Sequence, residues 1–487
     1  MLAFNYIRFV LLPLCALVLG SCAASLPVGP VEVVFIKSEQ VFTGALQQQS
    51  AAERLLLAAT AEGLVAMDRR GDVIPAIAER WIVSDDGLSY IFRIRDLDPL
   101  EDKQVSAEEV SSALRRNLRS LRGTTLGLDL AKIDEIRAMT DRVIEIILTS
   151  PMPDFLRVLA QPELGIRHGG RGFGPMLRVQ GVSSLPSILG DTRSRFRDLS
   201  QTEGLRQIAI SEVSAEEAVD SFANADADIV LNGSLSDLPL ANTGPLTRGT
   251  IKMDAALGLF GFLITNNNGF LADPLHRQAL SIAVDRERLL EPFNVDGWQS
   301  TAWVVPPELG TAISATSSRW EQVPLSERRS IASQRVSAWK RSSGQKLELS
   351  IALPNGPGSD ILFERISRDY AAIGIRATRA NSEEEADLKL HDKVARFYSP
   401  RWFLNQLNCR FRLGLCSMEA DSLVEKSTLE KNLDRKTELL DLAHRAMLDS
   451  EVFIPLGAPI RWSLVRGDLA GFEENRWAFH PLQVLAN

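Results

Sequence analysis

Hydrophobic and polar positions along the 487-residue chain follow two different periods, which indicates a protein built from both helices and strands. Residues 31–36, VEVVFI, form a β-branched apolar run that predicts a strand, and we expect a helix near residues 50–61 to follow it. Residues 89–94, SYIFRI, alternate between polar and apolar side chains, as a strand with one buried face does. We therefore predict an α/β or α+β chain.

The block around that second strand predicts a small α/β unit. A glycine turn is expected at residues 70–71, a short helix near 75–80, and a hairpin turned at 85–87, Asp-Asp-Gly. A further helix begins after Ser106, because Ser106 and Glu109 have the spacing of a capping box. These residues specify turns and a core, and they indicate no activity.

The stretch DPLHRQALSIAVDRERLL, residues 273–290, predicts two helices with a corner between them. The Asp273 carboxylate can accept hydrogen bonds from the first helical turn, and Pro274 suits the first helical position. Asp285 can cap the second helix. The apolar positions at helical spacing are Leu275, Ala279, Ile282 and Ala283 in the first helix and Leu289 and Leu290 in the second.

The amino-terminal residues have the pattern of a secretion signal. Residues 9–20, FVLLPLCALVLG, form an apolar run that follows Arg8 and is short for a membrane-spanning helix. The run ends in Leu-Gly-Ser-Cys, so residues 1–21 resemble the signal peptide of a bacterial lipoprotein, with Cys22 as the lipidation site. A plain signal peptide with an incidental Cys22 is the alternative.

Composition narrows the possible functions. The formal net charge is −8, which argues against a nucleic-acid-binding protein with a broad basic face. The chain that remains after cleavage is long enough for two or three domains. Its cysteines are Cys22, Cys409 and Cys416, and the last two could form a disulfide in an oxidising compartment.

Short motifs then recur in one order along most of the chain. The early ones are Glu62-Gly63-Leu64, Pro75, Ala78-Glu79, Trp81, Ser84-Asp85-Asp86-Gly87-Leu88, Phe92, Arg95 and Ser106-Ala107-Glu108-Glu109-Val110. The later ones are Gly172-Phe173-Gly174-Pro175, Ala227-Asp228-Ile229, Arg277, Ala279, Ala283, Asp285-Arg286, Ile373-Gly374-Ile375 and Ile454-Pro455-Leu456. In this order they resemble the signature of family 5 extracellular solute-binding proteins, the oligopeptide and dipeptide receptors of ATP-driven importers.

The resemblance implies an α/β, bilobed periplasmic-binding-protein-like fold of type II, in the peptide-binding cluster, with an extra inserted domain. We expect lobe I to comprise residues 22–50, 172–250 and 455–487, the inserted α/β domain residues 51–171, and lobe II residues 251–454. Two crossings would join the lobes and act as a hinge, so that closure traps a ligand in the cleft.

The resemblance also implies a lipid-anchored receptor at the periplasmic face of a membrane. It would capture a peptide or peptide-like solute and deliver it to an ABC permease, and through it to an ATPase subunit. We expect a monomer with no cofactor, no metal, no nucleic-acid partner and no enzymatic activity. A sensor or chaperone that uses the same fold without transport is the alternative.

One segment departs from the family pattern. Peptide receptors of this family hold the ligand's terminal ammonium with an aspartate four residues before a proline, and in RFYSPRWFL, residues 396–404, Arg396 occupies that position. A guanidinium cannot accept a hydrogen bond and repels an ammonium. Our hypothesis is that Arg396 favours a ligand with a carboxylate, a phosphate or a blocked terminus. A surface arginine, or a shift of alignment by one residue, is the alternative.

Other candidate ligand-binding residues are Phe397 and Trp402 in the same segment, Asn266 and Asn267 after an apolar strand, and Trp298 and Trp303 beside a loop that ends in two prolines. The asparagines could instead be turn residues, and the tryptophans could instead pack in a core. The chain has no His-Glu-x-x-His helix, no Gly-x-Ser-x-Gly elbow and no phosphate-binding glycine loop, which argues against an enzyme.

Overall fold

The computed structural model describes residues 29–37, 50–95, 106–168, 171–178, 188–190, 206–241, 249–295, 297–309, 320, 322–382 and 385–485. The predicted signal peptide and its Cys22 lie outside these residues. The chain divides into two units, residues 1–30 and 31–487, and every element below belongs to the second. In the described part of the chain, none of the helices combines the length and the apolar character needed to cross a membrane.

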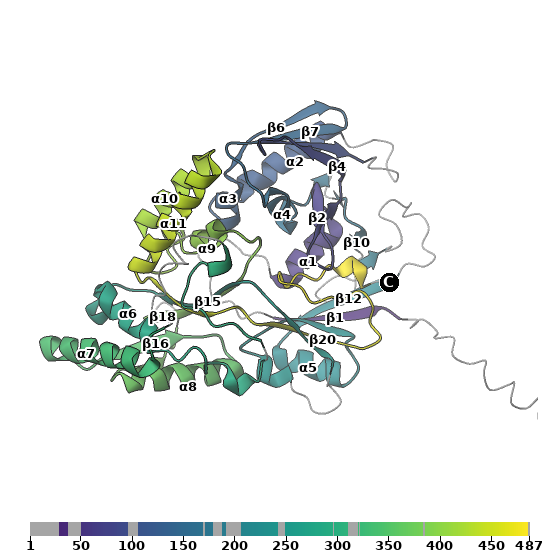
Figure 1. Ribbon diagram of the computed structural model, residues 1–487. Helices are drawn as coiled ribbons and strands as arrows, with labels where there is room; N and C mark the ends of the chain where they lie inside the picture. Colours follow the sequence, from purple (N-terminus) through teal and green to yellow (C-terminus); the bar gives the residue numbers. More distant parts are fainter. Residues whose placement is uncertain are drawn as a thin grey trace, which may run out of the picture. The chain divides into compact units, whose positions relative to one another are not determined.

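A seven-stranded sheet, the first sheet, forms one part of the molecule (Figure 1). Its strands, in spatial order, are β10 (Met176–Arg178), β11 (Ile188–Gly190), β12 (Arg206–Val213), β1 (Val31–Ile36), β13 (Ile229–Ser234), β20 (Arg461–Val465) and β14 (Ile251–Asp254). Strand β1 is parallel to both its neighbours. Val33 and Phe35 of β1 pack in one core with α1 (Ala51–Thr60), whereas Val34 and Ile36 pack in another with α5 (Ala215–Ala223). Both faces of the sheet are therefore covered.

A five-stranded sheet, the second sheet, is built in the same way. Its spatial order is β17 (Arg376–Arg379), β16 (Glu348–Ala352), β18 (Leu388–Val394), β15 (Gly258–Ile264) and β19 (Phe453–Gly457). The helices of one core are α6 (Pro274–Ala283), α7 (Leu325–Ser343) and α8 (Pro357–Ala372), and those of the other core are α9 (Pro400–Gln406), α10 (Met418–Leu429) and α11 (Leu433–Asp449). Alternate residues of β15 enter the two cores, because Phe260 and Phe262 pack with α6 while Leu259 and Leu263 pack with α9.

Residues 62–168, which we call the inserted segment, form an antiparallel sheet with helices. The sheet order is β4 (Ala78–Val83), β5 (Ser89–Ile94), β7 (Val143–Leu148) and β6 (Ile133–Thr140). The other elements up to the next strand of the first sheet are β2 (Val65–Met67), β3 (Val73–Pro75), α2 (Ala107–Ser120), α3 (Thr125–Leu130), α4 (Phe155–Leu159), η1 (Pro162–Leu164), β8 (Arg167–His168) and β9 (Arg171–Gly172). Their apolar side chains share one core with those of α9, α10 and α11, and Figure 1 shows α3 beside α9.

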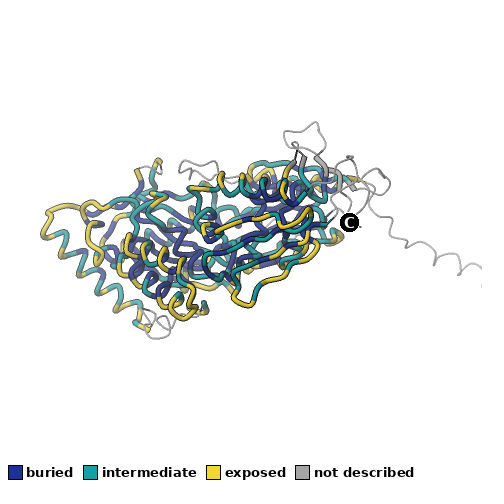
Figure 2. The backbone as a smooth tube through the Cα atoms, turned by 90° about the horizontal axis from the view of Figure 1, so that it is seen from above, coloured by how far each residue is buried: buried dark blue, intermediate teal, exposed yellow. Residues whose placement is uncertain are grey.

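Short 3-10 helices complete the described structure. They are η2 (Leu238–Ala241), η4 (Gly269–Ala272), η5 (Glu291–Phe293), η6 (Pro307–Leu309), η7 (Cys409–Phe411) and η8 (Leu482–Val484). Figure 2 shows that buried residues run through the interior and that exposed residues lie at its edges.

Most elements predicted from the sequence are confirmed. Strands β1 and β5 occupy the predicted ranges, and the capping box of Ser106 and Glu109 starts α2. The glycine turn and the hairpin are also confirmed, with positive φ angles at Gly71 and Gly87. These elements, which depend on local rules, are thus read correctly from the sequence.

The helix predicted near residues 75–80 is wrong. This part of the chain is extended, and β4 pairs with β5, with Trp81 opposite Phe92 and Ile82 opposite Ile91. Contacts with a neighbouring strand outweigh the local preference, as is common for short segments.

The second helix predicted after Asp285 is also wrong. Helix α6 begins as predicted, because the Asp273 side chain accepts from the N–H of Leu275. The chain then turns, since the Asp285 N–H donates to Asp369 Oδ2 at 2.9 Å and the buried Arg286 donates to the Pro455 carbonyl at 2.7 Å. Tertiary hydrogen bonds therefore fix a corner here instead of a helix start.

Candidate functional site

The chain crosses between the two large sheets twice, and the crossings are neighbours. Strand β14 of the first sheet leads to β15 of the second through residues 255–257, and β19 of the second leads back to β20 of the first through residues 458–460. β15 pairs with β19, and β14 pairs with β20. A side chain at Gly258 would come within 2.0 Å of the Lys393 carbonyl, so glycine permits the close approach at this point.

An ion pair between the sheets lies at these crossings. The Arg461 guanidinium of β20 donates from Nη1 to Oδ2 of Asp392 in β18 at 2.9 Å, and its Nη2 lies 2.9 Å from Asp392 Oδ1. The side chains are 15% and 18% exposed. A largely buried, charge-assisted hydrogen bond of this kind connects the two sheets.

Arg396 follows β18 and faces the inserted segment. Its Nη1 lies 2.7 Å from Glu163 Oε1 and 3.4 Å from Gln161 Oε1. Burial opposes ionisation of Glu163, but the positive charges of Arg396 and Arg54 outweigh burial and lower the pKa of this carboxyl group. Glu163 is therefore an anion, and its ion pair with Arg396 connects the inserted segment to the segment after β18.

Two more cations lie within electrostatic range of these pairs. Burial and the nearby Arg396 lower the pKa of Arg54, in the first turn of α1, to about 10. Burial and the nearby Arg54 lower the pKa of Lys393 in β18 to about 8. We call this group the interlobe charge cluster, and it comprises Arg54, Glu163, Asp392, Lys393, Arg396 and Arg461.

A second polar contact joins α9 to the inserted segment. Arg401 Nη2 donates to the main-chain oxygen of Asp129 at 2.6 Å, and Arg401 Nε lies 3.4 Å from Asp129 Oδ1. Asn405 Nδ2 donates to the same carboxylate oxygen at 2.7 Å. Burial raises the pKa of Asp129 to about 6, although Arg401 and Asn405 oppose the rise. This contact lies in the core that α9 shares with α3.

The candidate aromatic residues are mostly core residues in this arrangement. Phe397, Trp402 and Trp303 are buried, and the Trp303 ring lies 6.0 Å from the ring of His444. Trp298 is partly buried next to the crossings, where its Nε1 donates to the Ala458 carbonyl at 2.9 Å. Trp298 therefore lies beside the crossing at residues 458–460.

The candidate asparagines lie at the other end of β15. Asn266 donates from Nδ2 to Asp387 Oδ1 at 2.7 Å, and Asn267 is exposed. Since Gly258 pairs with Val394 and Ile264 pairs with Leu388, Arg396 lies beyond the opposite end of the strand. The structure does not bring these asparagines together with Arg396.

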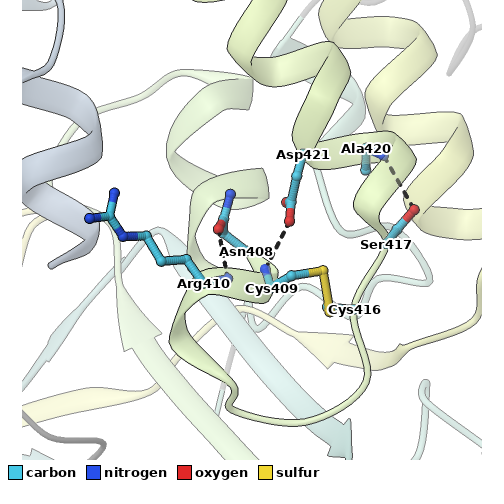
Figure 3. Close-up of a disulfide and its surroundings, with 7 residues drawn as sticks. All are labelled: Asn408, Cys409, Arg410, Cys416, Ser417, Ala420 and Asp421. Atoms are coloured by element: carbon cyan, nitrogen blue, oxygen red, sulfur yellow. Dashed lines mark hydrogen bonds between the residues drawn. A yellow bond between two sulfur atoms is a disulfide. The ribbon is translucent and has the colours of Figure 1, made fainter. Parts of the chain in front are cut away.

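The structure joins Cys409 and Cys416 in a disulfide that closes a loop between α9 and α10 (Figure 3). The Cys409 N–H donates to Asp421 Oδ2 at 2.9 Å, and the Ser417 hydroxyl oxygen accepts from the N–H of Ala420. The N–H of Leu415 inside the loop donates to the Ile264 carbonyl at 2.6 Å. The crosslinked loop thus supports the end of β15.

Reasoning from the sequence missed several charged residues of this site, namely Arg54, Glu163, Asp392, Lys393, Arg461, Asp129 and Arg401. Their partners are far away along the chain, so no local spacing identifies them. The alternation of β18 places Asp392 and Lys393 on opposite faces, and its sequence, LKLHDKV, contains other polar residues, so the pattern does not set these two apart. Within the described residues, no group of three or more His, Cys, Asp or Glu side chains could hold a metal ion.

Comparison with known proteins agrees with this geometry. No protein-family model matches the chain. The probable di/tripeptide-binding protein 5 of Pseudomonas aeruginosa is 23% identical over 459 residues, which cover 83% of this chain and 85% of that protein. The di/tripeptide-binding protein 2 of the same organism is 22% identical over 82% of this chain and 84% of the relative.

Solved structures share the fold over nearly the whole chain. OppA of Haemophilus influenzae in complex with the peptide RPPGFSPFR gives a TM-score of 0.76 at 15% identity, and covers 94% of this chain and 99% of that one. The murein tripeptide binding protein MppA of Escherichia coli gives 0.75 at 17% identity, with 93% and 98% covered. The unliganded open form of MppA, which is 18% identical with 94% and 98% covered, gives 0.63.

The fold is thus an α/β, bilobed periplasmic-binding-protein fold of the OppA type, as the sequence predicts. The resemblance to family 5 extracellular solute-binding proteins is confirmed, because the homologues are di/tripeptide-binding and oligopeptide-binding proteins and the structural neighbours are of the OppA and MppA type.

Proposed function

We propose that this protein is the solute-binding receptor of an ABC importer, and that it captures a peptide or peptide-like small solute between two lobes. The observation that carries the proposal is the pair of short neighbouring crossings, beside which Arg461 of the first sheet pairs with Asp392 of the second. Such a connection allows one sheet to rotate against the other and to close on a guest. The names of the relatives, and the peptide bound to OppA, support a peptide as the guest.

The lobes follow from the sheets under this proposal. Lobe I contains the first sheet, lobe II contains residues 258–457, and the inserted segment lies between β1 and β10. The crossings at 255–257 and 458–460 lie a few residues after the positions 251 and 454 expected from the sequence. Helix α1, which the sequence assigned to the insertion, packs on the first sheet and is assigned here to lobe I.

The arrangement of the described residues is the closed one under this proposal. The TM-score is lower for the unliganded open form of MppA than for the other MppA structure. The ion pair of Arg396 with Glu163 also connects lobe II to the inserted segment. Opening would separate these two side chains and admit the solute.

We further propose a place at the periplasmic face of a membrane, with a lipid on Cys22, a permease and its ATPase subunit as partners, and a monomeric state without catalysis. Relatives named as periplasmic proteins support the compartment. Replacement of Cys22 by serine tests the anchor: the protein should leave the membrane fraction and lose its acyl mass. An unchanged distribution would contradict the anchor.

Binding and closure test the receptor itself. The chain without its first 22 residues is titrated with a library of di-, tri- and oligopeptides by calorimetry, and its radius of gyration is measured by X-ray scattering. Binding with a ligand-dependent decrease in radius is expected, because the ligand must favour the closed state. Mass spectrometry of protein isolated from its own host identifies the solute. If no peptide binds and the radius stays constant, the proposal fails.

A sensor or chaperone that does not feed a transporter is the second candidate. The observation in its favour is the buried contact of Arg401 with Asp129, because full separation of lobe II from the inserted segment must expose it. Uptake of labelled peptide by host cells with and without the gene separates the two candidates. Equal uptake combined with tight binding would favour the sensor.

A further inference from the structure

The interlobe charge cluster contains more positive than negative groups. Arg54, Lys393, Arg396 and Arg461 carry the cations, and Glu163 and Asp392 carry the carboxylates. Both carboxylates already have a cationic partner, since Arg461 donates to Asp392 Oδ2 at 2.9 Å and Arg396 Nη1 lies 2.7 Å from Glu163 Oε1.

Some polar atoms of the cluster are enclosed but form no hydrogen bond within the described part of the chain. Arg54 Nε is enclosed and has no acceptor among the described residues, and Glu163 Oε2 is enclosed there without a donor. Enclosed polar atoms without partners are rare in proteins, and they point to a group that binds at the site. A cation enclosed without enough counter-charge is costly, so an added anion would stabilise this cluster. The depressed pKa values of Arg54 and Lys393 agree with this excess of positive charge.

The structure also indicates which anion fits. The Arg396 guanidinium already forms an ion pair with the Glu163 carboxylate, so its position suits a carboxylate partner. The Glu163 side chain comes from η1 of the inserted segment and Arg396 from the segment after β18, so the pair breaks when the inserted segment moves away from lobe II. A carboxylate on the solute can then take the place of the Glu163 carboxylate, or add to it beside Arg54.

We propose that the interlobe charge cluster binds a carboxylate of an acidic peptide or peptide-like solute, and that Glu163 is an internal competitor for Arg396. The inference rests on the proposed receptor function and adds the chemical class of its ligand. It also explains how a chain of this fold functions with an arginine at position 396.

Calorimetric titration with matched peptides tests the inference. The probes are N-acetylated tripeptides of one sequence in three forms, with a glutamate and a free carboxyl terminus, with a glutamine and a free terminus, and with a glutamine and a terminal amide. The acetyl group removes the ammonium from every probe. Affinity should fall by about tenfold for each carboxylate removed that contacts the cluster, as expected for a charge-assisted hydrogen bond.

Three variants test which residues of the cluster contact the carboxylate of the peptide. Glu163→Gln should raise the affinity for the acidic peptide by about tenfold, because Arg396 loses its internal partner while keeping an amide beside it. Arg54→Gln and Arg396→Gln should lower that affinity by about tenfold or more and leave the amidated peptide unchanged. Arg368→Gln, at an arginine of α8 that is 63% exposed, is the matched control and should change neither. The increase expected for Glu163→Gln cannot result from a folding defect.

The outcomes distinguish the two proposals. If peptides bind and close the protein, but acidic and amidated forms bind equally in all variants, the carboxylate site is wrong and the receptor function stands. If an inorganic phosphate titration shows tighter binding than any carboxylate, the ligand class is wrong. If no peptide of any form binds, the receptor function fails, and the carboxylate site fails with it.

Discussion

Arg401 on α9 and Asp129 on α3 form an ion pair whose side chains are 3% and 2% exposed, and this pair connects α9 to the inserted segment. Asn405 also donates to the Asp129 carboxylate, so the anion has two side-chain donors. The pair lies in an apolar core to which both parts of the chain contribute. Removal of the Arg401–Asp129 ion pair therefore tests directly how much this contact stabilises the packing of α9 against the inserted segment.

Replacement of Arg401 by methionine should lower the free energy of unfolding by about 3–5 kcal/mol, because Asp129 is left as an uncompensated buried charge. The double variant with Asp129→Leu should recover most of this loss, since an apolar pair needs no counter-charge. Urea denaturation measures both. Arg368→Met on α8 is the control and should stay within about 0.5 kcal/mol of the unchanged protein. A loss for Arg401→Met no larger than that would refute the role of this pair.

Lys132 should make stability depend on pH. Its side chain is buried, and Nζ donates to Ser150 Oγ at 2.8 Å. Burial, together with the charges of Arg401 and Lys436, lowers the pKa of Lys132 to about 5, below its unfolded value of 10.5. Between these values the unfolded chain binds more protons than the folded one, so this contribution makes stability rise with pH.

Lys132→Met should therefore be more stable than the unchanged protein at pH 6, and the difference should shrink as the pH rises to 9. Chemical denaturation at four pH values measures the difference. Lys346→Met, on an exposed residue, is the control for the loss of a charge. A difference that is constant with pH would show that Lys132 is protonated in the folded protein.

The disulfide of Cys409 with Cys416 should contribute about 2 kcal/mol, as expected for a short loop closed in the unfolded chain. The double variant Cys409→Ser, Cys416→Ser removes it, and the melting temperature should fall under oxidising conditions only. Under reducing conditions the variant and the unchanged protein should melt together. A melting temperature of the unchanged protein that does not respond to reductant would contradict the expectation.

Binding of an acidic peptide should weaken as the pH rises from 7 to 9. Burial and the charge of Arg54 set the pKa of Lys393 at about 8, and the other charged groups of the cluster are Asp392, Arg396, Arg461 and Glu163. Lys393 is the cation of this set that loses its charge in this range, so the attraction for a carboxylate decreases. Calorimetry with the N-acetylated acidic peptide measures the effect.

The amidated peptide and the Lys393→Gln variant are the controls for this pH dependence. Neither should show the decrease, because one lacks the anion and the other lacks the titrating cation. An equal decrease for the amidated peptide would assign the effect to a general loss of structure.

The sequence predicted the elements whose rules are local. The alternation of residues 89–94 and the capping box of Ser106 and Glu109 act over a few residues, and both lead to the observed elements. The corner near Asp285 was predicted, but the absence of a second helix after it was not, because the Asp285 N–H donates to Asp369, which lies 84 residues away. Local rules describe only those hydrogen bonds whose two partners are close along the chain.

The candidate site also has features that are visible in the sequence and others that depend on contacts between distant residues. The departure at Arg396 from the family pattern is visible in the sequence, because it is a change of residue type at a known position. Its partner Glu163 is not visible, since η1 and the segment after β18 meet only in the folded chain. Side-chain type and the family pattern predict Phe397 and Trp402 as ligand-binding residues, whereas their position in the core depends on how α9 and the segment before it pack.

The two crossings at 255–257 and 458–460 run side by side, so they restrict how the sheets can move. Two adjacent covalent links suppress sliding and leave essentially one angular coordinate. A single spectroscopic distance between the two sheets, from a spin label on α1 to another on β18, should then report the whole conformational state, and intermediate distances should correspond to partial rotation about the same axis.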